Sequence, residues 1–187
     1  MFFVSTFIEI CSLAEVGSRG ADFSMIISCL DPQASEPECL SKLDRRKREI
    51  LRFDDLIDHA DGKQAPSLEN ISQLIQVGRS EHEKLLIHCH QGISRSTAGA
   101  MIILASRYPD RVEELSDFVL NSRSCPWPNS LMLELADDEL GLGGQLSEQG
   151  LKVRAKNATL NPEWVNWLST THRRREVEEL AARASNT

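Results

Sequence analysis

A cysteine and an arginine with five residues between them stand in the run His-Cys-His-Gln-Gly-Ile-Ser-Arg-Ser, which occupies residues 88 to 96. A cysteine thiolate is a nucleophile. A planar guanidinium can hold two oxygens of one phosphoryl group at once, a geometry that lysine does not reproduce. Cys89 and Arg95 on one loop can therefore surround a tetrahedral oxyanion, and this pattern predicts chemistry on phosphate.

Two apolar segments flank this run, which we call the phosphate loop. Residues 84–87 have the length of a strand, and residues 97–105 have the length of a helix. A strand, a tight loop and a helix N-terminus direct the loop amides at one point, where the helix dipole adds roughly half a positive charge. This field favours the thiolate of Cys89 at the base of the loop and an anion above it.

The remaining loop positions have separate expected roles. Gly92 permits a backbone conformation that a side chain would obstruct. Ser96 can donate its hydroxyl to the sulfur when the thiolate departs, and His88 is expected to orient the loop through backbone contacts. The expected substrate-binding positions are His90, Gln91, Gly92, Ile93 and Ser94.

The loop sequence allows two other interpretations. One is a buried structural cysteine beside a surface arginine, since cysteine is often simply buried. The other is a zinc site formed by His88, Cys89 and His90. Adjacent residues of a strand point to opposite faces and make poor joint ligands, so we expect no metal and no cofactor.

The loop resembles the signature H-C-x-x-G-x-x-R-[S/T] of the cysteine-dependent protein tyrosine phosphatase superfamily. Its five fixed positions are filled by His88, Cys89, Gly92, Arg95 and Ser96. The chain looks like a compact, dual-specificity-like member of bacterial type, and the resemblance extends over roughly residues 1–140. It implies a phosphocysteine intermediate on Cys89, with Arg95 and the loop amides holding the phosphoryl oxygens.

The same resemblance implies a general acid on a loop upstream of the cysteine. Residues 50–53 alternate like a strand, and three carboxylates follow them: Asp54, Asp55 and Asp58. We expect Asp55 to be the acid, because in the family the acid follows the strand after one intervening residue. Asp54 is the second choice and Asp58 the third, and any of them could instead be a solvated loop carboxylate.

Asn129 belongs to a segment that resembles the Arg-x-x-x-x-Pro-Asn pattern of the dual-specificity group, starting at Arg123. The family pattern implies that this asparagine hydrogen-bonds the phosphate loop. Its position ahead of a helix also suits an N-cap, and the two roles are compatible. Arg123 is expected to be a structural or rim residue.

The whole-chain properties suit one globular domain of 187 residues, with 41% hydrophobic residues. The net charge of −7 argues against nucleic acid or an anionic membrane as a partner. The first ten residues lack a basic region and are interrupted by Glu9, which favours a strand over a signal peptide. An odd number of cysteines without regular spacing fits a reducing compartment, so we expect a cytoplasmic protein.

The predicted fold class is α/β, with a central, mostly parallel sheet flanked by helices, of the dual-specificity phosphatase type. Strands are expected at 2–10, 23–29, 48–53 and 84–88, and helices at 66–77, 95–106, 110–121 and 129–140. We expect a catalytic domain over residues 1–142 and a polar extension over 143–187 with a helix from 161 to 184. That helix could pack on the domain, be loosely attached or dock a partner. Trp164 and Trp167 share one of its faces.

The predicted function is hydrolysis of phosphotyrosine, with phosphoserine and phosphothreonine as further substrates, on a phosphorylated protein. A phosphoprotein-binding module without turnover is the alternative from a different class. A phosphoinositide phosphatase is disfavoured because no lysine stands in the loop. An RNA 5′-phosphatase is disfavoured by the acidic charge balance.

Overall fold

The fold is built on a four-stranded sheet in the order β1-β4-β2-β3, and every strand pairing is parallel within residues 7–19, 22–42 and 44–185, which the computed structural model describes. The strands are β1 (Ile8–Ser12), β2 (Met25–Leu30), β3 (Arg48–Arg52) and β4 (Leu85–Cys89). Parallel strands end at the same edge, so β4 delivers Cys89 beside the ends of β1 and β2. The predicted α/β class is confirmed.

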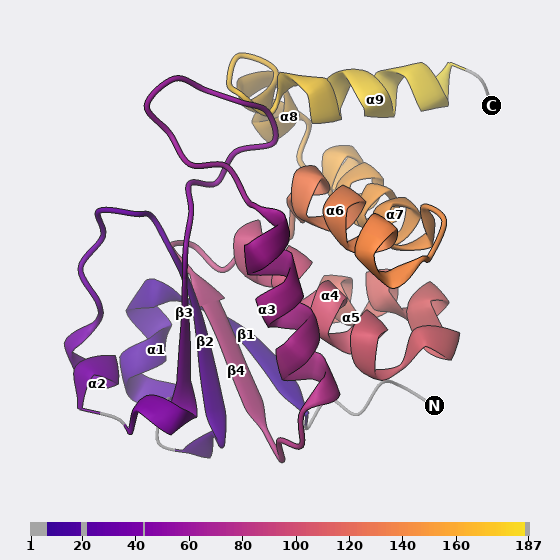
Figure 1. Cartoon of the computed structure of the whole chain (residues 1–187). Coiled ribbons are helices and arrows are strands. Elements are labelled where there is room, and N and C mark those ends of the chain that lie inside the picture. The colour runs from indigo at the N-terminus through magenta and orange to yellow at the C-terminus, as the bar shows by residue number, and fades with distance from the viewer. Residues whose placement is uncertain (1–6, 20–21, 43, 186–187) are drawn as a thin grey trace.

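Helices cover both faces of this sheet (Figure 1). On one face lies α1 (Leu13–Arg19), with α2 (Glu38–Ser41) beside it. The other face carries α3 (Leu68–Arg79) and α4 (Arg95–Arg107), behind which pack α5 (Leu115–Ser122), α6 (Ser130–Leu140) and α7 (Gln145–Leu160). Two further helices, α8 (Pro162–Leu168) and α9 (Arg174–Ala184), run across the top of Figure 1. Short 3-10 turns lie at Arg45–Lys47 and Pro109–Glu114.

The alternation of side chains along the strands divides the core in two. Ile27 and Ile87 belong to the larger cluster between the sheet, α3 and α4, whereas Ile26 and Leu86 belong to the smaller cluster under α1. β4 is buried at all of its positions because both of its faces and both of its edges are covered. The strand that ends at the phosphate loop is thus the most enclosed one.

Local sequence signals place several helix ends. α3 begins with a capping box in which the Ser67 hydroxyl accepts from the Asn70 amide and the Asn70 side chain accepts from the Ser67 amide. Asn129 caps α6, which ends at Gly141 in the left-handed conformation, with φ of 66°. The helices predicted for 66–77, 95–106 and 129–140 are present with shifted ends.

Other elements differ from the prediction. The strand expected at 2–10 is described only from Ile8 and runs on to Ser12, and residues 2–6 of it lie outside the described part of the chain. α1, α2 and α7 were not predicted. The helix expected at 110–121 is a 3-10 turn followed by α5, because Arg111 has a non-helical backbone, with φ of −124° and ψ of 21°.

The single helix predicted for 161–184 is wrong, since the structure has α8 and α9 with a turn between them. Ser169, Thr170 and Thr171 stand at this break, and each hydroxyl donates to a backbone carbonyl three residues earlier, at 2.7 to 2.8 Å. Such bonds compete with helix continuation. After the break, residues 171–173 lie beside the phosphate loop and line the same pocket.

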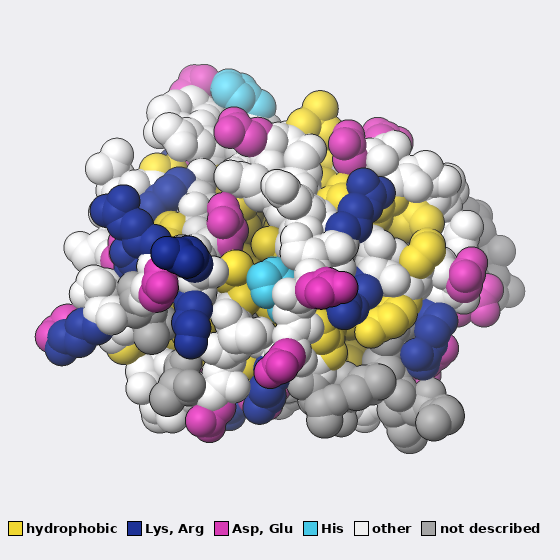
Figure 2. Space-filling model, turned by 60° about the horizontal axis from the view of Figure 1, so that its bottom comes forward, with side chains coloured by type: hydrophobic (Ala, Val, Ile, Leu, Met, Phe, Trp, Pro, Cys, Tyr) yellow, Lys and Arg dark blue, Asp and Glu magenta, His cyan; other side chains and the backbone are white. Residues whose placement is uncertain are grey.

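The face at the bottom of Figure 1 carries basic and acidic side chains interspersed with apolar ones (Figure 2). The net charge of −7 is therefore not gathered into one acidic field on this face. Within the described residues, no helix is both long and apolar enough to span a membrane.

Candidate active site

A pocket of about 280 Å³ opens at the carboxyl edge of the sheet, where the phosphate loop connects β4 to α4. Cys89, His90, Gln91, Ile93, Ser94 and Arg95 contribute to its lining. This edge is where α/β proteins bind ligands in general. The loop also leads into a helix of 13 residues, whose N-terminus favours anions.

Cys89 lies buried in this pocket, with 3% of its surface exposed. Its Sγ is 3.2 Å from the Oγ of Ser96, on the first turn of α4. The Ser96 hydroxyl can donate to sulfur at this distance, as the sequence predicts.

Gly92 satisfies two separate requirements of the loop. Its φ is +70°, in the left-handed region that side chains disfavour. A Cβ at this position would also lie 2.7 Å from the backbone carbonyl carbon and oxygen of Cys11, at the end of β1. The loop therefore packs directly on the neighbouring strand end, and only glycine fits both constraints.

Backbone hydrogen bonds from two other segments fix the loop. The Leu13 amide at the start of α1 donates to the His90 carbonyl at 3.1 Å, and the Trp127 amide donates to the Ile93 carbonyl at 2.9 Å. Arg123 donates to the Gln91 carbonyl at 3.3 Å. The predicted structural or rim residue Arg123 therefore contacts the loop itself.

Arg123 is held by Glu15 of α1, at 3.1 Å. The Ser12 amide donates to the Glu15 carboxylate at 2.8 Å, and this bond, followed by the charge of Arg123, lowers the pKa of Glu15 to about 2. Glu15 therefore stays ionised over the physiological range and keeps Arg123 oriented toward the loop.

His88, which was expected to act through backbone contacts, has its Nε2 2.7 Å from the Ser28 hydroxyl on β2. Burial lowers the pKa of His88 to about 4. The imidazole is thus neutral at neutral pH, and it links the strand that carries Cys89 to its neighbour.

Arg95 lies at the first position of α4, with 4% of its side chain exposed. It donates to the Asp31 carboxylate at 2.6 Å and to the Phe53 carbonyl at 2.8 Å. Its Nε is buried without a hydrogen-bond partner in the described part of the chain. An oxyanion in the pocket would satisfy this donor.

Asp31 is a pocket residue that the sequence reasoning missed. Asp31 directly follows β2. Because parallel strands end at one edge of the sheet, where ligands bind, its position after a strand could have suggested that it lies near the phosphate loop. No local pattern around Asp31 links it to Arg95, which is 64 positions away.

Asp55, the predicted acid, lines the same pocket. Its Oδ1 accepts from the Ser94 hydroxyl at 2.8 Å and from the Asn129 amide at 3.0 Å, and it also accepts from Arg173. Burial raises the pKa of Asp55, but Arg173, Arg95 and these hydrogen bonds outweigh it, so that the pKa lies below its ordinary value.

The other two candidate acids lie elsewhere. Asp54 accepts from the Gln64 amide at 2.8 Å, lies 3.4 Å from Lys63 and lines a neighbouring cleft. Asp58 is exposed and lies 3.4 Å from Arg175. Of the three carboxylates, the structure therefore brings only Asp55 into the pocket with Cys89.

Asn129 combines the predicted cap with an unexpected contact. Its Oδ1 accepts from the Met132 amide at 3.1 Å, which caps α6. Its Nδ2 donates to Asp55 and to the Leu56 carbonyl, both at 3.0 Å. The predicted hydrogen bond to the phosphate loop is replaced by bonds to the segment that carries Asp55, because Asn129 faces residues 55–56.

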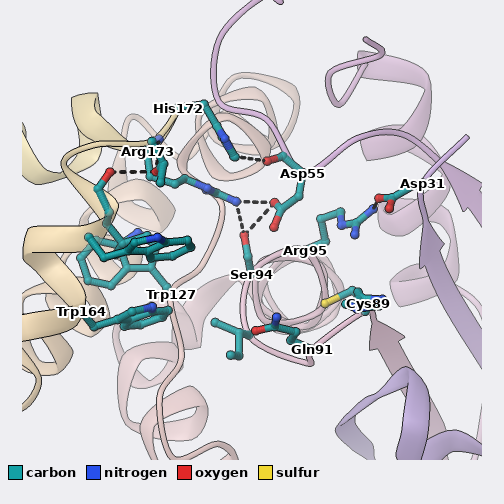
Figure 3. Close-up of a pocket in the computed structure, with 15 residues that line it drawn as sticks. Asp31, Asp55, Cys89, Gln91, Ser94, Arg95, Trp127, Trp164, His172 and Arg173 are labelled. Atoms are coloured by element: carbon teal, nitrogen blue, oxygen red, sulfur yellow. Dashed lines mark hydrogen bonds and ion pairs between the residues drawn. The ribbon is translucent and has the colours of Figure 1, made fainter.

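Residues 161–176, which we call the C-terminal segment, supply one side of the pocket. Figure 3 shows the Arg173 guanidinium reaching Asp55 and Ser94, with Trp127 and Trp164 nearby. From the sequence, residues 161–176 are expected in a polar extension, and their part in the site was not predicted. Trp164, Trp167 and the arginine run at 173–175 were the sequence features that could have pointed to a functional role.

Within residues 7–19, 22–42 and 44–185, no three His, Cys, Asp or Glu side chains gather in a way that could hold a metal ion. The arrangement offers a thiol, a guanidinium, a carboxylate and a helix N-terminus around one cavity. This set can bind a tetrahedral oxyanion and move a proton beside it.

No protein-family model matches the chain, and no curated protein matches it. Solved structures do resemble it. The phosphatase domain of Yvh1 from Chaetomium thermophilum is 17% identical with a TM-score of 0.54, and the match covers 78% of this chain and 96% of that one. Human DUSP28 is 16% identical with a TM-score of 0.52, over 78% of this chain and 99% of that one. The chain therefore has the fold of the dual-specificity phosphatases.

Proposed function

We propose that this protein hydrolyses phosphate monoesters through a phosphocysteine at Cys89, and that its substrates are phosphotyrosine side chains of proteins. The observation that carries the proposal is the presence of Cys89, Arg95 and Asp55 around one pocket at the N-terminus of α4. The solved structures of the same fold include a phosphatase domain, which agrees with it.

In the first step, the Cys89 thiolate attacks phosphorus in line with the ester oxygen. An S–P bond forms as the P–O bond breaks, and the departing oxygen takes the proton of Asp55. The N–H groups of the loop and of Arg95 hold the three equatorial oxygens. The unpaired Nε of Arg95 is one donor available for this purpose.

In the second step, water attacks the phosphocysteine. The Asp55 carboxylate takes a proton from the water, the S–P bond breaks and inorganic phosphate leaves. The electron pair returns to the Cys89 sulfur, where the Ser96 hydroxyl at 3.2 Å stabilises the thiolate. Each turnover thus returns Cys89 and Asp55 to their starting states.

The pocket wall favours an aromatic leaving group. Trp127 and Trp164 pack edge to face with ring centroids 5.5 Å apart, and Trp167 lines the pocket beside them. Aromatic rings pack well in such arrangements, so a tyrosine ring finds more contact here than a serine side chain. A protein substrate is preferred to a nucleic acid because of the net charge of −7.

The test is hydrolysis of p-nitrophenyl phosphate and of a phosphotyrosine peptide at pH 5 to 8, in EDTA and reductant. Cys89→Ser should abolish turnover of both substrates. Asp55→Asn should lower kcat by about 10²- to 10⁴-fold on the phosphotyrosine peptide and by less on p-nitrophenyl phosphate, whose leaving group needs a proton less. Cys125→Ser and Asp58→Asn are matched controls and should retain activity.

Retained activity in Cys89→Ser would rule out the proposed mechanism. Phosphopeptide binding without turnover in the native chain would instead support a phosphoprotein-binding module.

A further inference from the structure

We propose that Arg173 is a positioning residue for Asp55, so that the C-terminal segment completes the acid site. This inference rests on the proposed function of Asp55. The guanidinium donates to the Oδ1 of Asp55 and to the Ser94 hydroxyl at 2.5 Å (Figure 3). It also donates to Glu176 at 3.1 Å, and only 5% of the side chain is exposed. One side chain therefore joins the Asp55 segment, the phosphate loop and α9.

A buried network fixes the position of Arg173. Glu176 is 1% exposed and also accepts from the Trp127 indole at 2.7 Å and from the Ser130 amide at 2.9 Å. The backbone of Trp127 is in turn bonded to the phosphate loop at Ile93. A functional side chain held by such outer contacts keeps its geometry.

A second contact from the same turn fixes the backbone of the acid. His172 Nε2 lies 2.8 Å from the Asp55 carbonyl oxygen. The C-terminal segment thus holds Asp55 by its main chain as well as by its carboxylate.

The pattern of contacts leaves one carboxylate oxygen available. Within the residues that the structure describes, the hydrogen bonds to the carboxylate of Asp55 come from Ser94, Asn129 and Arg173, and all of them go to Oδ1. No hydrogen bond in the described part of the chain involves Oδ2. A proton on Oδ2 can be transferred to a leaving oxygen while Oδ1 stays fixed, which is what a general acid requires.

The charges around Asp55 couple its proton to the substrate. The charged or titratable groups facing this site in the described part of the chain are Cys89, His90 and Arg95 from the phosphate loop, Asp31 after β2, and His172, Arg173 and Glu176 from the C-terminal segment. Arg173 and Arg95 together lower the pKa of Asp55. A phosphate dianion bound at Arg95 offsets these cations and favours protonation of Asp55 when the ester is in place.

The experiment compares two aryl esters. Phenolate is a poor leaving group that needs a proton, whereas p-nitrophenolate leaves readily. Arg173→Gln should lower kcat by about 10- to 100-fold on phenyl phosphate and by less than about threefold on p-nitrophenyl phosphate. The alkaline limb of its kcat profile should move to higher pH, because the pKa of Asp55 rises when the cation is removed.

Two further variants complete the comparison. Arg174→Gln, at a neighbouring residue whose side chain is 72% exposed, is the matched control and should behave as the native chain. Arg173→Lys keeps the charge but loses the planar fork, so it should keep the native pH profile with an intermediate kcat. If Arg173→Gln does not fold, the two esters are compared with Arg173→Lys instead. A larger loss of kcat on phenyl phosphate than on p-nitrophenyl phosphate then supports the positioning role, and equal losses contradict it.

A double variant separates this inference from the proposed function. Adding Arg173→Gln to Asp55→Asn should cause little further loss, because the two residues act together. Equal losses on both esters with an unmoved pH profile would show a purely structural role for Arg173. If Asp55→Asn itself shows no leaving-group dependence, the proposed acid is wrong and the inference fails with it.

Discussion

Arg95 is positioned by contacts from two strand ends. Asp31 follows β2 and accepts at 2.6 Å, and the Phe53 carbonyl follows β3 and accepts at 2.8 Å. These contacts aim a buried guanidinium at the phosphate loop before any substrate is bound. Such preorganisation is what makes electrostatic stabilisation of a transition state effective.

Replacing Arg95 by lysine tests this geometry. A compact ammonium cannot keep both anchoring contacts and also hold two phosphoryl oxygens. We expect Arg95→Lys to lower kcat by about 10²- to 10³-fold at unchanged folding, measured by steady-state kinetics and circular dichroism. Arg174→Lys, at an exposed arginine that pairs with Glu178, is the control. Near-native kcat in Arg95→Lys would show that charge alone suffices.

Gly92 offers a matched pair with Gly62, because both have φ of 70°. A Cβ at Gly62 meets nothing within 4 Å, whereas one at Gly92 meets the backbone of Cys11. Gly62→Ala should cost about 1–2 kcal/mol of unfolding free energy from φ alone. Gly92→Ala should cost about 1–3 kcal/mol more, from the overlap, and should lose activity. Denaturant unfolding measures both, and equal losses would contradict this account.

At the scale of elements, the N-terminus of α6 joins helix stability to the acid site through Asn129. Its two functions can be separated by residue type, since serine can cap a helix but cannot reach Asp55. Asn129→Ala should lose about 1 kcal/mol of unfolding free energy. Asn129→Ser should recover much of it, while both variants lose activity. Recovery of activity in Asn129→Ser would show that capping is the only function.

Sequence could predict the elements whose signals are local. The strand, loop and helix around Cys89 follow from apolar runs and a glycine, and the start of α3 follows from Ser67 and Asn70. Asp55 was predicted as the acid from its place after β3, and the structure brings it to the pocket. Its role as acid stays a prediction.

Contacts between distant segments could not be predicted in this way. Arg173 and Asp55 are 118 positions apart, and no periodicity relates them. The break between α8 and α9 depends on hydroxyl groups that bond back to the backbone at residues 169–171, and such residues also occur inside helices. The sequence alone therefore could not show that the C-terminal segment forms one side of the pocket.

In the molecule as a whole, residues near both ends of the chain contact the phosphate loop or the residues that hold it. Cys11 of β1 packs under Gly92, and Glu176 of α9 anchors Arg173 and Trp127. A perturbation of either contact should therefore reach the site.

The pH dependence of stability should report His88. Its pKa is about 4 in the folded chain against 6.5 as the ordinary value, because burial disfavours the charged ring. Between these pH values the unfolded chain binds a proton that the folded chain does not. His88 therefore does not reduce the free energy of unfolding above pH 6.5. As the pH drops from 6.5 toward 4, the free energy of unfolding falls by at most about 1.4 kcal/mol per pH unit because of this group.

Urea unfolding at pH 7 and pH 5, followed by tryptophan fluorescence, measures this effect. His88→Gln should lose less unfolding free energy than the native chain over this interval. Parallel losses in the two proteins would show that other groups account for the pH dependence.

The proposed mechanism depends most directly on a covalent phosphoryl group on Cys89. The measurement is rapid mixing of the native chain with a phosphotyrosine peptide, a denaturing quench within one turnover, and mass spectrometry of the proteolytic peptide that contains residues 88 to 96. We expect one phosphoryl group on the Cys89 sulfur in the native chain and none in Cys89→Ser. Turnover with phosphate on His88 or His90, or with no covalent adduct at all, would contradict it.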